Sequence, residues 1–207
     1  GTKIAKKKIK LITRKNNGHR ASVKKDFFKS VKELNADIIA IQETKLQEDQ
    51  RTDEMINWDS YESFWSYSTV KKGYSGVAVY SGLKPASVKN GIGISKFDDE
   101  GRILELDFKD FVFFNIYFPN GQMNDERLAY KLDFYNSFFK YTDALKKKGR
   151  SIIITGDFNT AHNDIDLKHP KANKDRSGFI RIERDWLDKI SENGYVDTFR
   201  HFYPDEV

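Results

Sequence analysis

The sequence contains no cysteine and no long apolar run. Without cysteine the chain forms neither disulfides nor thiolate metal sites, which fits an intracellular location. The longest apolar segments, Ile152–Ile154 and Phe111–Phe114, have the length of strands and fall far short of the roughly 20 residues of a membrane-spanning helix. Internal repeats, low-complexity tracts and Pro/Gly-rich linkers are also missing. These absences exclude a disulfide-stapled miniprotein and a repeat architecture, and favour one folded domain over residues 1–207, with 1–8 as a basic leader.

Charge and hydrophobicity favour a globular protein with a polyanionic partner. Hydrophobic residues make up 38% and aromatic residues 14% of the 207 residues, which is enough for a sizeable core. The 36 Lys and Arg exceed the 31 Asp and Glu, and the sequence pI is about 9.1. A basic balance favours nucleic acid, because neutralised phosphates release counterions. A basic surface without such a partner explains the charge equally well.

Apolar and alternating runs predict a mixed α/β domain. We expect strands over residues 9–13, 37–42, 61–67, 76–80, 102–108, 111–117 and 151–155. We expect helices over 23–34, 127–148 and 182–193, the second of them ended by Gly149. The hairpin at 102–117 argues for antiparallel pairing rather than a purely alternating βαβ fold. The long polar loop 160–181 is typical of a functional loop.

Polar residues follow three of the predicted strands. Asp157 and Asn159 follow the strand at 151–155, and Glu43 ends the strand at 37–42. Tyr117 and Asn120 end a third strand. Strand ends present catalytic groups from a rigid scaffold, and Mg²⁺ prefers carboxylate and water oxygens. Taken singly, each residue has an ordinary alternative: an Asx turn, a surface Glu, a core aromatic or a turn after Pro.

The residue identities and the order of several segments resemble those of the exonuclease III family of abasic-site endonucleases. The matching segments are 42–45 (QETK), 73–78 (GYSGVA), 117–120 (YFPN), 156–159 (GDFN), 161–167 (AHNDIDL), 170–173 (PKAN), 177–179 (SGF), 183–184 (ER) and 197–200 (DTFR). The resemblance extends from about Lys10 to Pro204. It implies a four-layer αββα sandwich and a Mg²⁺- or Mn²⁺-dependent hydrolase that cleaves DNA 5′ to an abasic site or removes nucleotides from 3′ ends.

The resemblance also implies roles for particular residues. Glu43 matches the main metal ligand, and Asn17 a polar residue beside it. Asp157 matches the residue that orients or deprotonates the attacking water, and Asn159, Tyr117 and Asn120 match groups that bind the phosphate. DNA would be held by Arg20, Lys45, Tyr74, Lys171, Asn173 and Arg176. The partner would be double-stranded DNA rather than a membrane, and the protein a monomer in the cytoplasm of a bacterium or archaeon, or in a eukaryotic nucleus.

Two residues near the N-terminus depart from the family pattern Ser-Trp-Asn-x-Asn-Gly-x-Arg-Ala. Arg14 stands in place of a largely buried Trp, and Lys15 in place of an Asn beside the metal. An ammonium group has no lone pair for Mg²⁺ and repels it, so Lys15 would pair with Glu43 and fill the metal position. A core guanidinium is costly unless it reaches water. We therefore expect weak metal binding and a disordered or displaced first strand.

The family pattern also continues beyond Val207 with a His-bearing segment and further strands of one sheet. We therefore expect this chain to be truncated at the C-terminus, with those strands missing, and to be completed by a C-terminal fragment or inactive. Two alternatives stay open. One is a catalytically dead DNA-binding homologue, and the other is a phosphodiesterase acting on a phosphoinositide or sphingolipid.

Overall fold

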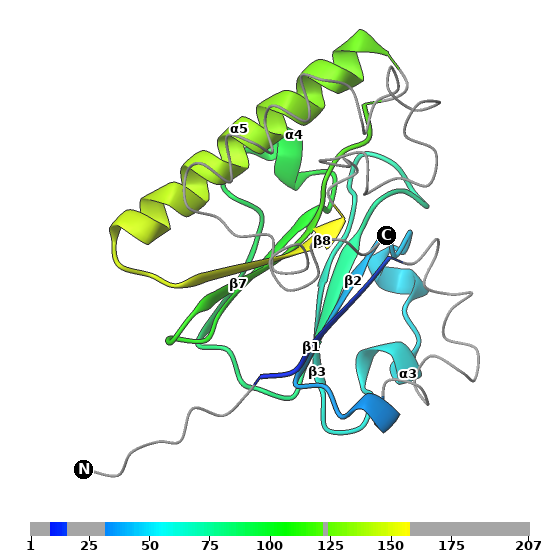
Figure 1. The fold of residues 1–207 in the computed structure, drawn as a ribbon. Coiled ribbons are helices and arrows are strands. Elements are labelled where there is room, and N and C mark those ends of the chain that lie inside the picture. The colour runs from blue at the N-terminus through cyan, green and yellow to red at the C-terminus, as the bar shows by residue number, and fades with distance from the viewer. Residues whose placement is uncertain (1–8, 16–31, 122–123, 158–207) are drawn as a thin grey trace, which may run out of the picture. The chain divides into compact units, whose positions relative to one another are not determined.

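The computed structural model describes residues 9–15, 32–121 and 124–157, which form two compact units. The first unit contains the described residues up to Tyr117 together with Leu145–Asp157, and the second contains Phe118–Ala144. The first unit holds all the described strands, arranged as two four-stranded sheets (Figure 1). Within the described residues, no helix is long and apolar enough to cross a membrane.

The first sheet has the strand order β1-β2-β4-β3. These strands are β1 (Leu11–Lys15), β2 (Ile38–Gln42), β4 (Val77–Ser81) and β3 (Glu62–Ser66). β1 pairs with β2 in parallel from Leu11 opposite Ile38 to Lys15 opposite Gln42, and the other pairings are antiparallel. The first strand is therefore in register at the sheet edge, and the expectation that it is displaced was wrong.

The second sheet has the strand order β5-β6-β7-β8. These strands are β5 (Ser87–Asn90), β6 (Ile103–Asp107), β7 (Val112–Tyr117) and β8 (Ile152–Asp157). β6 and β7 form the predicted hairpin, and β8 joins β7 in parallel. Both sheets are mixed, which confirms the prediction of an α/β domain that contains antiparallel sheet rather than a purely alternating βαβ fold.

Apolar side chains from both sheets meet in a shared core. The cluster contains Ile38, Ala40, Val77 and Val79 from the first sheet and Leu104, Leu106, Phe111 and Phe113 from the second. On the other face of the first sheet, Ile39, Ile41, Ala78 and Tyr80 pack with Met55, Trp58 and Trp65. Because side chains alternate between the faces of a strand and both faces are covered, β2 and β4 are apolar except at their last residues, Gln42 and Ser81, and all ten of their residues are buried.

The helices agree only in part with the sequence expectations. α5 (Asp125–Lys147) is the predicted long helix, and Gly149 follows it with a φ of 80°. Within the second unit, Phe118 packs its ring against Phe134, Tyr135 and Phe138. The sequence did not reveal the short elements η1 (Glu48–Gln50), α3 (Asp53–Ile56) and α4 (Ser95–Asp98), nor the fully exposed β5. The expected helix at 182–193 lies outside the described residues, as does nearly all of the one at 23–34.

The two packed sheets confirm the α/β sandwich expected from the resemblance. The expectation that strands are missing at the C-terminus refers to a part of the family pattern that lies outside the described residues. The organisation of residues 1–207 as one domain stays a prediction.

Candidate active site

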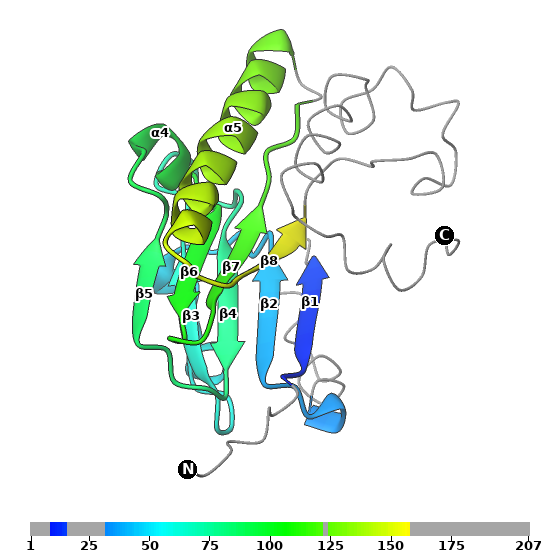
Figure 2. The ribbon, with the colours of Figure 1, turned by 60° about the vertical axis from the view of Figure 1, so that its left-hand side comes forward.

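Four strands end together at one end of the first unit (Figure 2). Lys15, the last residue of β1, lies beside Gln42, the last residue of β2, and Glu43 follows. In the other sheet Tyr117, the last residue of β7, lies beside Asp157, the last residue of β8. Since each pair of strands is parallel, both pairs present their carboxyl ends at the same edge. The predicted metal ligand, catalytic carboxylate and phosphate-binding tyrosine are thereby brought to one place.

Lys15 lies between the two carboxylates of this site. Its Nζ is 2.8 Å from Asp157 Oδ2 and 3.9 Å from Glu43 Oε2. Lys45 approaches Glu43 from elsewhere, with its Nζ 3.5 Å from Oε1. The predicted pairing of Lys15 with Glu43 is thus present, but the shorter contact is with Asp157. Three predicted site residues, Glu43, Lys45 and Asp157, therefore belong to one ion-pair network centred on a residue that departs from the family pattern.

The Tyr117 ring completes the surroundings of Lys15. The ammonium lies 5.8 Å from the centre of the Tyr117 ring. Burial, and after it the Glu43 carboxylate, raise the pKa of the Tyr117 hydroxyl. The phenol is therefore a hydrogen-bond donor at neutral pH. A protonated phenol at this position suits an anionic ligand such as a phosphate oxygen.

The loop after β2 is held in an unusual backbone conformation. Glu43 and Lys45 have φ angles of 60° and 54°, a region that non-glycine residues adopt rarely and that often marks functional sites. The Thr44 and Lys45 amides donate to the carbonyls of Gly76 and Ser75 at 3.0 and 2.8 Å. The predicted segment 73–78 therefore supports the segment 42–45 that carries Glu43.

Glycine is required at Gly76 because of this close approach. Its φ is 90°, and a Cβ there would lie 2.3 Å from Thr44 Oγ1.

Glycine is also required immediately before Asp157. A Cβ on Gly156 would lie 1.8 Å from the backbone oxygen of Ile116 in β7. This contact is backbone and cannot rotate away, so any side chain would push β8 from β7. Gly156 thus permits the strand pairing that sets Asp157 beside Tyr117.

Asn115 joins the two sheets directly beneath the site. Its Nδ2 donates to the carbonyls of Ile41 (3.0 Å) and Ala78 (2.9 Å), and its Oδ1 accepts from Gln42 Nε2 (2.7 Å). Gln42 also donates to Thr13 Oγ1 in β1 at 3.0 Å. Asn115 and Gln42 are almost fully buried. Sequence reasoning missed this bridge; its only signal was an Asn inside an otherwise apolar strand.

Arg102 lies behind Tyr117 and was also missed. Its Nη1 donates to the Tyr117 carbonyl (3.0 Å), and its guanidinium lies 5.0 Å from the Tyr117 ring centre. Its Nη2 donates to the Tyr74 hydroxyl (2.8 Å) and pairs with Glu100 Oε1 (3.3 Å). Tyr74, predicted to hold DNA, is thereby tied to Tyr117. The side chains of Arg102 and Glu100 are only 2% and 6% exposed, so this is a buried ion pair.

The remaining predicted residues divide into two groups. Asn120 is exposed and belongs to the second unit. Six others lie outside the described residues: Asn17, Arg20, Asn159, Lys171, Asn173 and Arg176. Arg14 is exposed, so it avoids the cost expected of a guanidinium in a core position.

The described residues do not fit a divalent metal by themselves. In the part of the chain that the structure describes, no group of three or more His, Asp, Glu or Cys side chains could hold a metal ion. Glu43 and Asp157 are both engaged by ammonium groups, and lysine offers no lone pair. The expected contact of Lys15 with Glu43 is present, and the expected weak metal binding stays a prediction.

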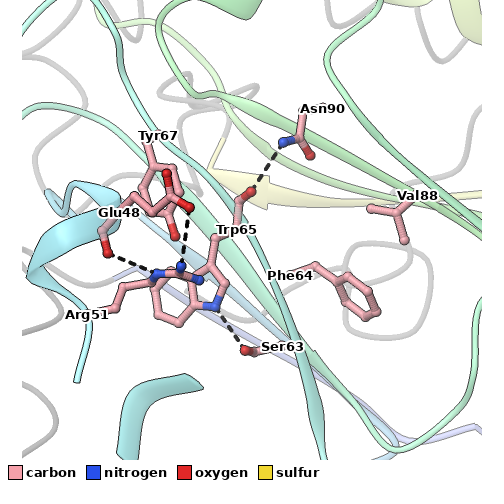
Figure 3. A pocket seen from close by; sticks show the side chains of 8 residues that line it. All are labelled: Glu48, Arg51, Ser63, Phe64, Trp65, Tyr67, Val88 and Asn90. Atoms are coloured by element: carbon pink, nitrogen blue, oxygen red, sulfur yellow. Dashed lines mark hydrogen bonds and ion pairs between the residues drawn. The ribbon is translucent and has the colours of Figure 1, made fainter. Parts of the chain in front are cut away.

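Away from this site, a cavity of about 720 Å³ lies among residues of and beside η1, β3 and β5 (Figure 3). Arg51 lies 5.6 and 5.4 Å from the ring centres of Trp65 and Tyr67. Its Nη2 is 3.7 Å from Glu48 Oε1, and Asn90 donates to the Trp65 carbonyl at 3.3 Å. The two charged side chains of the cavity thus contact each other and its amide contacts a backbone carbonyl, as expected of a packing feature.

Comparison with known proteins agrees with the geometry. Residues 15–205 match the model of the Endonuclease/Exonuclease/phosphatase family. The chain is 42% identical over 198 residues to an exodeoxyribonuclease of Bacillus subtilis, covering 95% of this chain and 77% of that protein. It is 35% identical to the DNA repair nuclease APEX1 of Danio rerio, spanning 96% of this chain but 64% of that protein.

A solved structure is similar throughout. An AP endonuclease from Archaeoglobus fulgidus matches with a TM-score of 0.85 and 27% identity, over 96% of this chain and 76% of that one. The family is one of divalent-metal-dependent hydrolases. Sequence, fold and the meeting of Glu43, Tyr117 and Asp157 lead to one conclusion: the chain belongs to the endonuclease/exonuclease/phosphatase family, in its branch of exonuclease III-type AP endonucleases.

Proposed function

We propose that this chain carries the catalytic centre of a DNA-repair phosphodiesterase that cleaves the backbone 5′ to abasic sites and removes nucleotides from 3′ ends. The observation that carries the proposal is the meeting of Glu43, Tyr117 and Asp157 at the ends of three strands. The names of the relatives, an exodeoxyribonuclease and a DNA repair nuclease, support this substrate class.

Each residue of the site is assigned one role in hydrolysis. Asp157 orients a water molecule and accepts its proton as the water oxygen attacks phosphorus and the bond to the 3′ oxygen breaks. The Tyr117 phenol donates a hydrogen bond to a phosphate oxygen, where negative charge grows. Asn120 and Asn159 are proposed to donate to the same phosphate. We propose Mg²⁺ or Mn²⁺ as the metal; Glu43 and Asn17 would hold it, and it would supply positive charge beside the phosphate.

Binding of the duplex is assigned to a separate set of residues. Lys45 and Tyr74 lie next to the site in the described structure. Arg20, Lys171, Asn173 and Arg176 are proposed to contact the backbone, with little reading of sequence. We further propose that the protein acts on double-stranded DNA as a monomer. Its location would be the cytoplasm in a bacterium or archaeon and the nucleus in a eukaryote.

Incision of a 5′-labelled duplex with one tetrahydrofuran abasic analogue tests the proposal. We expect a single cut directly 5′ to the analogue, abolished by a chelator. Asp157→Asn should lower the rate by about 100-fold or more, and Tyr117→Phe by a smaller factor, in line with the loss of one transition-state hydrogen bond. Lys84→Asn, which changes an exposed lysine outside the site, is the control. The absence of a cut 5′ to the analogue, or equal cutting by Asp157→Asn, would contradict the assignment.

One observation favours a second candidate, a DNA-binding homologue without nuclease activity. The 2.8 Å contact with Lys15 engages the carboxylate that the reaction needs. This candidate predicts duplex binding with no cut at any metal concentration. Electrophoretic mobility shifts run beside the incision assay separate the two, because only the nuclease converts the bound duplex to product.

A further inference from the structure

Lys15 places a fixed positive charge inside the catalytic centre. Its Nζ bridges Asp157 Oδ2, at 2.8 Å, and Glu43 Oε2, at 3.9 Å. The carboxylate side chains are 20% and 15% exposed, whereas that of Lys15 is 49% exposed. The ammonium therefore reaches from the rim towards two partly buried anions, and it contacts the carboxylates assigned to the metal and to the attacking water.

The strand pairing, rather than a loose surface chain, sets this position. Lys15 ends β1 in register with Gln42, the residue before Glu43. Two positions earlier, Thr13 accepts a hydrogen bond from Gln42 at 3.0 Å. The backbone of Lys15 is therefore anchored beside one carboxylate, and only its side chain spans the distance to the other sheet.

The charges at the site already balance without a metal. Lys15 and Lys45 carry two positive charges, and Glu43 and Asp157 carry two negative ones. Burial by itself would lower the pKa of the Lys15 ammonium, but the hydrogen bond to Asp157 and the nearby negative charges outweigh this effect and raise that pKa. Lys15 is thus a cation at neutral pH, and a divalent ion entering here must displace it from Asp157 and tolerate its repulsion.

We propose that the Lys15 ammonium is the resident cation of this centre and competes directly with the divalent metal on which the family depends. The inference deepens the proposed function and rests on its assignment of Glu43 and Asp157 to the catalytic centre. With Asn at position 15, as the family pattern has it, the same carboxylates would lack this counter-ion and present a more negative site. The one substitution therefore converts a metal-attracting centre into an internally neutralised one.

Metal binding without DNA tests this competition. Free Mn²⁺ is followed by electron paramagnetic resonance while the chain, Lys15→Asn, Lys15→Gln and Lys84→Asn are titrated. We expect the two Lys15 variants to bind Mn²⁺ at least about tenfold more tightly than the parent, because one unit charge within a few ångströms changes the energy of a divalent ion by more than RT even in a polar site. Lys84→Asn removes the same charge from an exposed position, so it should bind like the parent.

A thermal measurement guards against a folding artefact. Each variant is melted with and without Mn²⁺, because a ligand that binds only the folded state raises its stability. The Lys15 variants should gain more in melting temperature from Mn²⁺ than the parent and Lys84→Asn do. Equal Mn²⁺ affinity and equal gains in all four proteins would overturn the proposal. Because these measurements contain no DNA, equal Mn²⁺ affinities would not contradict the nuclease assignment. Failure to cut abasic DNA would likewise not contradict the competition between Lys15 and the metal.

Discussion

Replacing Asn115 would remove the polar link between the sheets. Its side chain makes three buried hydrogen bonds, two to carbonyls of the first sheet and one from Gln42. A typical net contribution of about 1 kcal/mol for each suggests that Asn115→Ala costs about 3 kcal/mol. That is a large part of the 5–15 kcal/mol by which domains are typically stable. Part of the loss arises because Gln42 keeps a buried amide with one partner fewer.

Asn115→Leu distinguishes lost hydrogen bonds from lost volume. Leucine fills the space, but it leaves the Gln42 amide without its shorter partner. If the lost hydrogen bonds account for most of the loss in stability, the leucine variant will be destabilised about as much as the alanine variant. If the cavity dominates, leucine will recover most of the stability, as is typical of a volume-conserving replacement in an apolar core.

Urea unfolding followed by tryptophan fluorescence measures both variants, with the free energy of unfolding obtained by linear extrapolation. Asn90→Ala is the matched control, because exposed Asn90 makes one hydrogen bond at 3.3 Å, to the Trp65 carbonyl. We expect this control to lose less than about 1 kcal/mol. Equal losses for Asn115→Ala and Asn90→Ala would refute the reasoning that the sheets are joined by this side chain.

Three further predictions concern other parts of the first unit. Gly156→Ala should separate β8 from β7 and lower the melting temperature sharply, because the new Cβ would lie 1.8 Å from a backbone oxygen. Arg102→Met should cost about 3–5 kcal/mol in urea unfolding, because it removes the cation that pairs with the buried Glu100 carboxylate. The Arg150 guanidinium holds the pKa of Asp107 below its usual range, so this pair stabilises above roughly pH 4 and its contribution is lost as the pH falls through the lowered value. Arg150→Met should therefore lower the melting temperature slightly at pH 6 and not at pH 2, and an equal loss at both would contradict the pairing.

The sequence predicted the elements whose patterns are strong. The apolar runs at 37–42, 111–117 and 151–155 correspond to β2, β7 and β8, which lie at the centre of the site. Tyr117 and Asp157 lie side by side because β7 and β8 are parallel, and the packing of the two sheets brings Glu43 to them. By contrast β5 has four exposed residues, so it shows no apolar alternation and was missed.

The two main surprises come from contacts that no local pattern encodes. Asn115 bonds to Ile41, 74 residues away in sequence, and its identity as a link between sheets depends on how the faces meet. Arg102 is fully buried although arginine is usually exposed, because Glu100, Tyr74 and Tyr117 surround it in the folded chain.

The contacts of Lys15 depend on both the sequence and the tertiary structure. The sequence by itself determined that a cation stands where the family pattern has Asn, and it predicted that this cation would oppose a metal. It could not determine which carboxylate the cation contacts, because Glu43 and Asp157 come from different sheets. Only their packing decided that the shorter contact is with Asp157, since strand register fixes the Lys15 backbone while the side chain reaches the nearer anion.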